Sequence, residues 1–170
     1  MTGVLMLWNT LPADEAAEEI LPCCGSKSWA HAMAARRPIR EETVLLAISD
    51  EVWKSLTESE WMEVFRSHPR IGESHPDGFS SPQSAAWSGE EQRKAAVATG
   101  DVKTALAEGN RIYEQRFHRI FIVCANGKSA SEILEILRKR LQNDDTTELR
   151  EAAEQQRQIV CLRLKKWLDS

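Results

Sequence analysis

One histidine is placed where a proton-transfer group could act. His68 follows an amphipathic stretch that ends at Arg66, and it precedes Pro69, which disfavours helical φ and ψ in the residue before it. Its side chain should therefore project from the first residues after an anchored helix, which suits a general acid or base. A surface role near the helix dipole is the competing interpretation. His75 is also followed by proline, but its Ser/Gly/Pro-rich surroundings should hold it less firmly.

An arginine interrupts the apolar side of the last predicted helix. Apolar residues over 147–168 recur at helical spacing and fall on one arc, which they share with only two polar side chains, Gln156 and Arg163. An arginine that faces a core must pair with another group or face a wet cavity. Arg163 is therefore either a structural ion-pair partner or a residue that recognises an anionic or carbonyl-rich ligand.

Ser88 and Glu91 have the spacing of a capping box, in which the two side chains accept hydrogen bonds at a helix start. This pattern predicts a helix that begins at Ser88. A hydrolase in which Ser88 is the nucleophile and His68 the base is a second possibility, which a capping role for the serine disfavours.

The spacing of the residues supports neither a metal site nor a phosphate-binding site. The four histidines contain no i, i+4 pair, and no cysteine lies at zinc-ligand spacing from another. No nucleophile elbow or phosphate-binding glycine loop is present. We expect no metal site, and we expect the four cysteines to be buried free thiols in a reducing compartment.

The composition describes an ordinary globular chain of 170 residues with a net charge of -4. No block of Lys and Arg could follow a phosphate backbone, so we expect no nucleic-acid partner. The apolar stretches are too short to span a bilayer, and the N-terminus does not resemble a signal peptide. A soluble, cytoplasmic protein with one domain over residues 1–170 is expected.

Helical periodicity dominates the chain and predicts an all-α fold, a single-domain multi-helix bundle. The expected helices cover about 12–21, 26–36, 41–49, 57–66, 88–117 with a break near 100, 129–141 and 147–168. Pro22 should end the first of them.

Two segments are less regular. Residues 67–87 are rich in proline, glycine and serine, and we expect an irregular surface segment of the kind that is usually functional or disordered. Ile120–Val123 has β propensity, but we interpret it as the buried end of the preceding helix.

Four stretches of the sequence resemble the motifs of one known family. Residues 68–73 read HPRIGE and resemble its HPRIG(E) motif, and residues 87–92 read WSGEEQ and resemble its WSxxEQ segment. FIVCANGKSA at 121–130 and IVCLRL at 159–164 resemble two further patterns. Together these stretches resemble the 2-oxo-4-hydroxy-4-carboxy-5-ureidoimidazoline (OHCU) decarboxylases. The resemblance covers nearly the whole chain, including Asn9 and Arg37-Pro38, with small departures at Asn126 and Ser131.

The resemblance assigns roles to particular residues. His68 and Glu91 would be catalytic, and the substrate-binding residues would be Pro69, Ser88, Gln92, Ile122 through its main chain, and Arg163.

The implied activity is a cofactor-independent carboxy-lyase that converts OHCU to (S)-allantoin, the last step from urate to allantoin in purine catabolism. No cofactor is expected, because the carbon that loses CO₂ adjoins a ring C=N bond that can accept the electron pair. The resemblance also implies a homodimer. The last residues do not form a peroxisomal tripeptide, which agrees with a cytosolic location.

A non-catalytic helical module is the main alternative, with apolar stripes that form a dimer or a partner-binding groove. Production of one enantiomer of allantoin from OHCU would distinguish the enzyme from the module.

Overall fold

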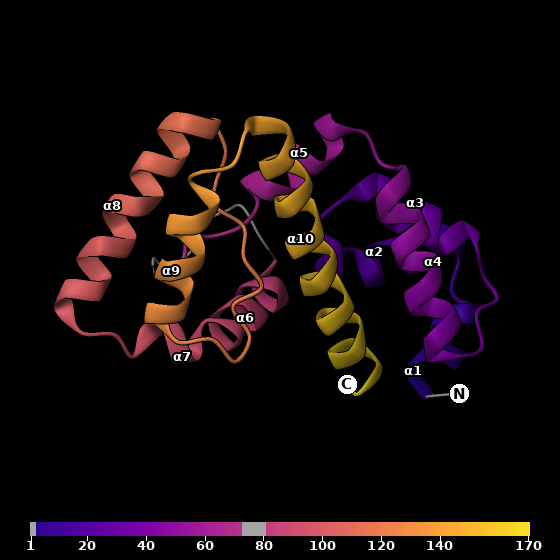
Figure 1. Ribbon diagram of the computed structural model, residues 1–170. Helices are drawn as coiled ribbons and strands as arrows, with labels where there is room; N and C mark the ends of the chain where they lie inside the picture. The colour runs from indigo at the N-terminus through magenta and orange to yellow at the C-terminus, as the bar shows by residue number, and fades with distance from the viewer. Residues whose placement is uncertain (1–2, 73–80) are drawn as a thin grey trace. The chain divides into compact units, whose positions relative to one another are not determined.

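The structure is a computed structural model that describes residues 3–72 and 81–170. All regular secondary structure in these two ranges is α-helical (Figure 1), so the all-α prediction is confirmed. Two compact units are present: the described residues up to Val64 together with Arg157–Ser170, and Phe65–Gln156. Each unit is described by itself below, and the single-domain organisation stays a prediction.

The first unit contains α1 to α4, most of α5 and the C-terminal part of α10. The bounds are α1 Gly3–Thr10, α2 Ala13–Cys24, α3 Lys27–Ala35, α4 Glu42–Ser55, α5 Glu58–Arg66 and α10 Asp145–Leu168. Helix α2 packs against α1 and α3, and α3 packs against α4. Helix α1 lies before the first helix predicted from the sequence, and α4 extends beyond the predicted end at Ser49.

The end of α2 corrects one prediction. Pro22 was expected to stop the helix, but it lies inside α2, which continues to Cys24. Cys23 and Cys24 are buried there, so packing outweighs the hydrogen bond that a proline nitrogen cannot make. Gly25, at φ 83°, then ends the helix by donating its N–H to the Leu21 carbonyl over 2.8 Å.

Arg37 and Asn9 hold the polypeptide around α1 together. Asn9 exchanges two hydrogen bonds with the backbone of Ile39, at 2.6 and 2.9 Å. The Arg37 guanidinium donates to three carbonyl oxygens, those of Trp8, Leu11 and Ala34. These contacts give hydrogen-bond donors to carbonyl groups at or just beyond the C-terminal ends of α1 and α3, where intrahelical partners run out.

The second unit contains α6 Pro82–Glu91, α7 Arg93–Ala96, α8 Gly100–Phe117, α9 Ala130–Arg140 and the N-terminal part of α10. Helices α8 and α9 pack side by side (Figure 1), and α7 packs against α9. Gly109 permits a close approach of α8 to α9, because a Cβ built there would lie 2.6 Å from Cδ2 of Leu137. Ser129 and Glu132 form the capping box that starts α9.

The segment after α8 is extended, so the predicted helical end at Ile120–Val123 is wrong. His118 adopts the left-handed conformation at φ 54°, which ends α8 at Phe117. Phe121, Val123 and Ala125 then join one hydrophobic core cluster, while the buried Ile122 and Cys124 alternate with them. This alternation is that of an extended chain.

The irregular segment expected at 67–87 is shorter than predicted. Helix α6 begins at Pro82, after Ser81 accepts a hydrogen bond from the Ser84 N–H as its cap. The last part of the segment is therefore helical, and residues 73–80, which include His75, lie outside the described residues.

Helix α10 begins at Asp145, two residues before the predicted start. The apolar arc predicted for it is confirmed by the burial of its members, Leu149, Ala152, Ala153, Ile159, Val160, Leu164 and Trp167. Gln156 and Arg163, the two polar residues of that arc, are also buried.

Candidate functional site

A cavity of about 550 Å³ lies in the second unit. Three segments supply its wall: the residues that follow α5, the helices α6 and α7, and the N-terminal half of α8. The described lining residues are Pro69, Ile71, Gly72, Ala85, Ser88, Gly89, Gln92, Ala95, Ala96, Lys103, Leu106 and Ala107. Pro69, Ser88 and Gln92, three of the residues predicted to bind substrate, therefore line the same cavity.

His68 lies immediately beside this cavity in the chain. Its N–H donates to the Phe65 carbonyl over 3.2 Å, so the residue continues the last turn of α5, and its side chain is half-buried. The next residue, Pro69, is buried and belongs to the cavity wall. His68 thus lies directly after a helix end, as predicted, and its chain neighbour Pro69 belongs to the cavity wall, although the imidazole is not among the described groups that line the cavity.

The residues after His68 are held by α8. Arg70 forms a bidentate ion pair with Glu114, at 2.5 and 2.9 Å. The buried Asn110 side chain donates to the Ile71 carbonyl over 3.2 Å. Arg70 therefore has an anchoring role, since its fork-shaped guanidinium matches one carboxylate.

Gly72 and Gln92 connect the two sides of the wall. Gly72 has a φ of 86°, a conformation that favours glycine, and its N–H donates to Oε1 of Gln92 over 3.2 Å. The side-chain oxygen of Gln92 therefore already accepts a hydrogen bond from the protein. Its carboxamide nitrogen has no hydrogen bond to any other described residue and can donate to a ligand.

Ser88 and Glu91 correct the capping-box prediction. Both lie within α6 rather than at its start, where Ser81 is the cap. Ser88 is 3% exposed and lines the cavity, and Glu91, the last residue of α6, is 7% exposed. Glu91 is buried in the same unit as His68, but it is not among the described lining residues.

The main chain around Ile122 is held by three side chains, from α9, from α10 and from the turn before α9. Arg140 donates to the Ile122 carbonyl, Gln155 accepts from the Cys124 N–H over 2.9 Å, and Lys128 donates to the Cys124 carbonyl over 2.7 Å. Ile122 is buried and does not appear in the described wall of the cavity.

Arg163 belongs to the first unit. It is 2% exposed, and its charge acts on the thiols of Cys23 and Cys24. Burial raises the pKa of both thiols, that of Cys24 to about 12, and Arg163 opposes this rise in both. The meeting of Arg163 with His68, Glu91 and Gln92 stays a prediction.

Several lining residues were not identified from the sequence. Lys103, Leu106 and Ala107 share one face of α8 at i, i+3, i+4 spacing, which was the available signal. Four alanines, at 85, 95, 96 and 107, make the wall hollow because their side chains end at Cβ. Lys103 supplies the one charge among the described lining residues, so the cavity suits a small ligand with acceptor atoms.

In the described part of the chain, no group of three or more His, Cys, Asp or Glu side chains could hold a metal ion. No helix within those residues is long and apolar enough to cross a membrane.

Comparison with known proteins identifies one family. A family model described as OHCU decarboxylase matches residues 9–165. The uric acid degradation bifunctional protein TTL of Arabidopsis thaliana is 31% identical over 144 residues, which are 85% of this chain and 44% of that protein. The uric acid degradation bifunctional protein of Bacillus sp. (strain TB-90) is 26% identical over 160 residues, 92% of this chain and 30% of that protein. The chain thus spans less than half the length of these relatives.

Two solved structures have the same fold. A crystal structure of an OHCU decarboxylase in the presence of (S)-allantoin matches with a TM-score of 0.76 and 30% identity, over 90% of this chain and 99% of that one. A crystal structure of an (S)-allantoin synthase matches with a TM-score of 0.72 and 17% identity, over 96% of this chain and 53% of that one. The second likeness concerns the fold alone.

Proposed function

Because the chain belongs to the OHCU decarboxylase family, we propose that it converts OHCU to (S)-allantoin and CO₂ without a cofactor. The observation that carries the proposal is the cavity beside His68, whose wall contains Pro69, Ser88 and Gln92. Three segments distant in sequence supply these residues and the rest of the wall. A related enzyme that this chain matches over nearly its full length was crystallised in the presence of (S)-allantoin.

The substrate itself provides the electron sink for this reaction. The bond to the carboxylate breaks and CO₂ leaves, and the released electron pair forms a C=C bond to the ureido-bearing ring carbon. The π electrons of the adjoining ring C=N bond move to the ring nitrogen, which takes a proton. The hydroxyl then loses a proton while the ureido-bearing carbon gains one, which gives allantoin. A single face of protonation produces the S enantiomer, so the protein must hold the ring and deliver the proton from one side.

The proposed roles follow the chemistry of the residues. His68, half-buried at the end of α5, polarises the hydroxyl and carboxylate end and transfers protons. Gln92 donates its carboxamide N–H to carbonyl or ureido oxygens, and Ser88 supports the substrate from the cavity wall. Glu91 and Arg163, both buried, fix the remaining ureido and ring atoms.

The test is turnover of freshly prepared OHCU, followed through the circular dichroism of (S)-allantoin against the racemic product of spontaneous decay. His68→Ala should lower kcat by roughly 10²–10⁴-fold, the usual contribution of one acid–base residue. His31→Ala is the matched control, since His31 is exposed on α3. Near wild-type turnover by a folded His68→Ala variant would exclude the proposed role.

Arg163 requires a separate measurement because it is buried. Arg163→Ala should raise KM, and it should also lower stability because a packed side chain is removed. An unchanged KM in the folded fraction would make Arg163 a structural residue only.

We also propose that the chain forms a homodimer and that it is located in the cytosol. Sedimentation velocity at several protein concentrations tests the first, and localisation of the tagged chain in cells tests the second. A single monomeric species at micromolar concentration would contradict the dimer.

A further inference from the structure

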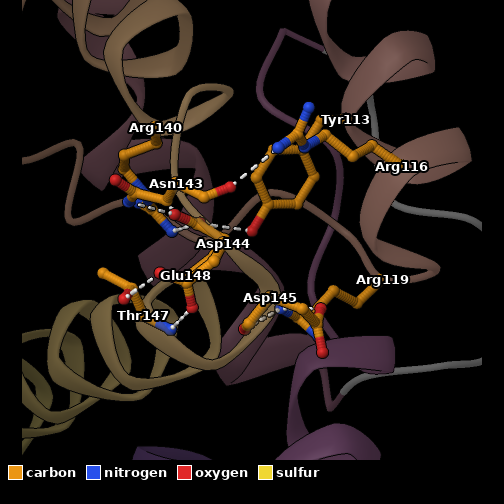
Figure 2. Close-up of polar contacts among 9 residues, drawn as sticks. All are labelled: Tyr113, Arg116, Arg119, Arg140, Asn143, Asp144, Asp145, Thr147 and Glu148. Atoms are coloured by element: carbon orange, nitrogen blue, oxygen red, sulfur yellow. Dashed lines mark hydrogen bonds and ion pairs between the residues drawn. The ribbon is translucent and has the colours of Figure 1, made fainter.

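Three helices of the second unit meet at a buried polar network (Figure 2). Glu148 of α10 accepts hydrogen bonds at Oε1 from Tyr113 of α8, at 2.5 Å, and from Nε and an NH2 nitrogen of Arg140 of α9, at 2.9 and 2.5 Å. Its Oε2 accepts from the Asn143 side chain over 2.9 Å. Tyr113 and Glu148 are fully buried, and Arg140 is 4% exposed.

The network extends beyond the three helices. The remaining terminal nitrogen of Arg140 donates to the Ile122 carbonyl over 2.5 Å, and the guanidinium carbon lies 4.6 Å from the Phe121 ring centroid. Tyr113 contacts the same ring edge-on, with centroids 5.2 Å apart. A buried ion pair is a weak source of stability, since well-packed apolar residues often do as well. Its contact with one peptide group points to positioning as its role.

The position of the Ile122 carbonyl determines the direction of the next N–H. A trans peptide is planar, so the N–H of Val123 points away from Arg140, on the opposite side of the Ile122–Val123 peptide. Val123 is buried, yet its N–H has no hydrogen bond to any other described residue. A buried N–H normally has a partner, and a cation at the carbonyl of the same peptide strengthens it as a donor.

We propose that Arg140, itself held by Glu148 and Tyr113, is a positioning residue that presents the Val123 N–H as a hydrogen-bond donor to the substrate. The acceptor would be a carbonyl or ring nitrogen of the bound imidazoline. This inference rests on the proposed function, because it deepens the description of the same ligand site. It assigns the fork of Arg140 two tasks: one side pairs with Glu148, and the other orients the peptide.

Arg140→Lys separates these tasks, because a lysine keeps the charge but cannot hold both partners in the geometry of a guanidinium. Tyr113→Phe is the milder variant, since it removes one hydrogen bond to Glu148 and retains the ring that packs on Phe121. Arg119→Lys is the matched control. Arg119 is also buried and also anchors the start of α10, through Asp145, but it makes no contact with the Ile122 carbonyl.

The first readout is the separation of KM from kcat in OHCU turnover. Arg140→Lys should raise KM about tenfold, the loss expected for one hydrogen bond, and change kcat less than about threefold. Tyr113→Phe should raise KM about twofold, and Arg119→Lys should leave it unchanged. Unchanged KM values in folded Arg140→Lys would overturn the proposal, as would an equal rise in Arg119→Lys.

The second readout does not require turnover. In protein labelled with nitrogen-15 valine, the Val123 amide resonance should shift on addition of (S)-allantoin in the wild type and in Arg119→Lys, but not in Arg140→Lys. If Arg140→Lys fails to fold, the test is the comparison of the wild type with Tyr113→Phe, in which KM should rise about twofold, and an unchanged KM in Tyr113→Phe would then overturn the proposal. Turnover without a Val123 shift would overturn this inference alone. A Val123 shift without turnover would overturn the proposed decarboxylation and retain Val123 as a ligand donor.

Discussion

Two glycines of the cavity wall should respond in opposite ways to the same substitution. Gly72 has a φ of 86°, and Gly89 lies within α6. A Cβ built at either position meets no atom within 4 Å, so steric contact does not distinguish the two sites. The effect of alanine at each position should therefore reflect the backbone alone.

The expected magnitudes follow from that difference. Gly72→Ala places a Cβ in a left-handed conformation, which costs roughly 1–2 kcal/mol of unfolding free energy. Gly89→Ala replaces glycine in a helix with the best helix former and should add about 0.5–1 kcal/mol. The two effects differ by roughly 1.5–3 kcal/mol, which for a chain of this size separates the two melting temperatures by roughly 3–12 °C.

Thermal and urea unfolding followed by far-ultraviolet circular dichroism measure both variants. Gly72→Asn provides a refinement: asparagine tolerates left-handed φ better than alanine, so its cost should be smaller. Gly72→Ala should also raise KM for OHCU, because Gly72 donates its N–H to Gln92 and a shifted loop weakens that contact. Equal stabilities of the two alanine variants, or a stabilised Gly72→Ala, would refute the reasoning.

Two further predictions concern α8. Burial, together with its hydrogen bond to Glu148, raises the pKa of Tyr113 above the usual value of 10.0. Since the folded-state pKa is the higher one, its contribution to stability is complete below pH 10.0 and declines as the pH rises further. The chain has a single tyrosine, so ultraviolet titration reports on Tyr113 alone and should detect no phenolate in the folded protein just above pH 10.0. Phenolate formation at that pH, with circular dichroism that still shows a folded protein, would contradict the raised pKa. Gly109→Ala should lower the free energy of unfolding by about 1–2 kcal/mol, because the new Cβ would collide with the Leu137 side chain. In a Leu137→Ala background the same substitution should raise that free energy by about 1 kcal/mol, as alanine favours a helix. Thermal unfolding measures both, and equal effects of Gly109→Ala in the two backgrounds would contradict the close approach of α8 to α9.

Helix starts were predictable where both partners of a cap lie within one turn. Thr57 and Glu60, like Ser129 and Glu132, exchange the hydrogen bonds of a capping box at or next to the predicted helix starts. Ser88 and Glu91 have the same spacing but do not form a cap. An earlier serine followed by proline, Ser81-Pro82, starts that helix first, so the local pattern alone does not say which of two candidate starts is used.

The polar interior was predictable in part. The periodicity of α10 indicated that Gln156 and Arg163 would be buried, because the helix repeat places them among apolar neighbours. It did not indicate the network around Arg140. That residue belongs to a run of three basic residues at the end of α9, where the negative end of the helix dipole alone would account for them, and its partners lie on other elements. Helix periodicity in the sequence shows which side chains share one face of a helix. Which residues those side chains contact depends on the tertiary packing of other elements.

The cavity wall was the least predictable part of the site. Alanine has no polar atom and carries no chemical signal, so the hollow depends on how the faces of α6, α7 and α8 come together. The extended segment after α8 was mispredicted for a related reason. His118 takes a positive φ that non-glycine residues seldom adopt, and the sequence has no glycine there to indicate it.

The alanines of that wall limit how the site could change during evolution or redesign. An alanine side chain has no rotamers, so the backbone alone determines the shape of that part of the hollow, and a ligand that packs there loses little affinity to side-chain ordering. Further truncation, to glycine, would remove a single methyl group and weaken a helix. A larger ligand would therefore require movement of whole helices, whereas valine or leucine at these positions would make the protein selective for smaller ones.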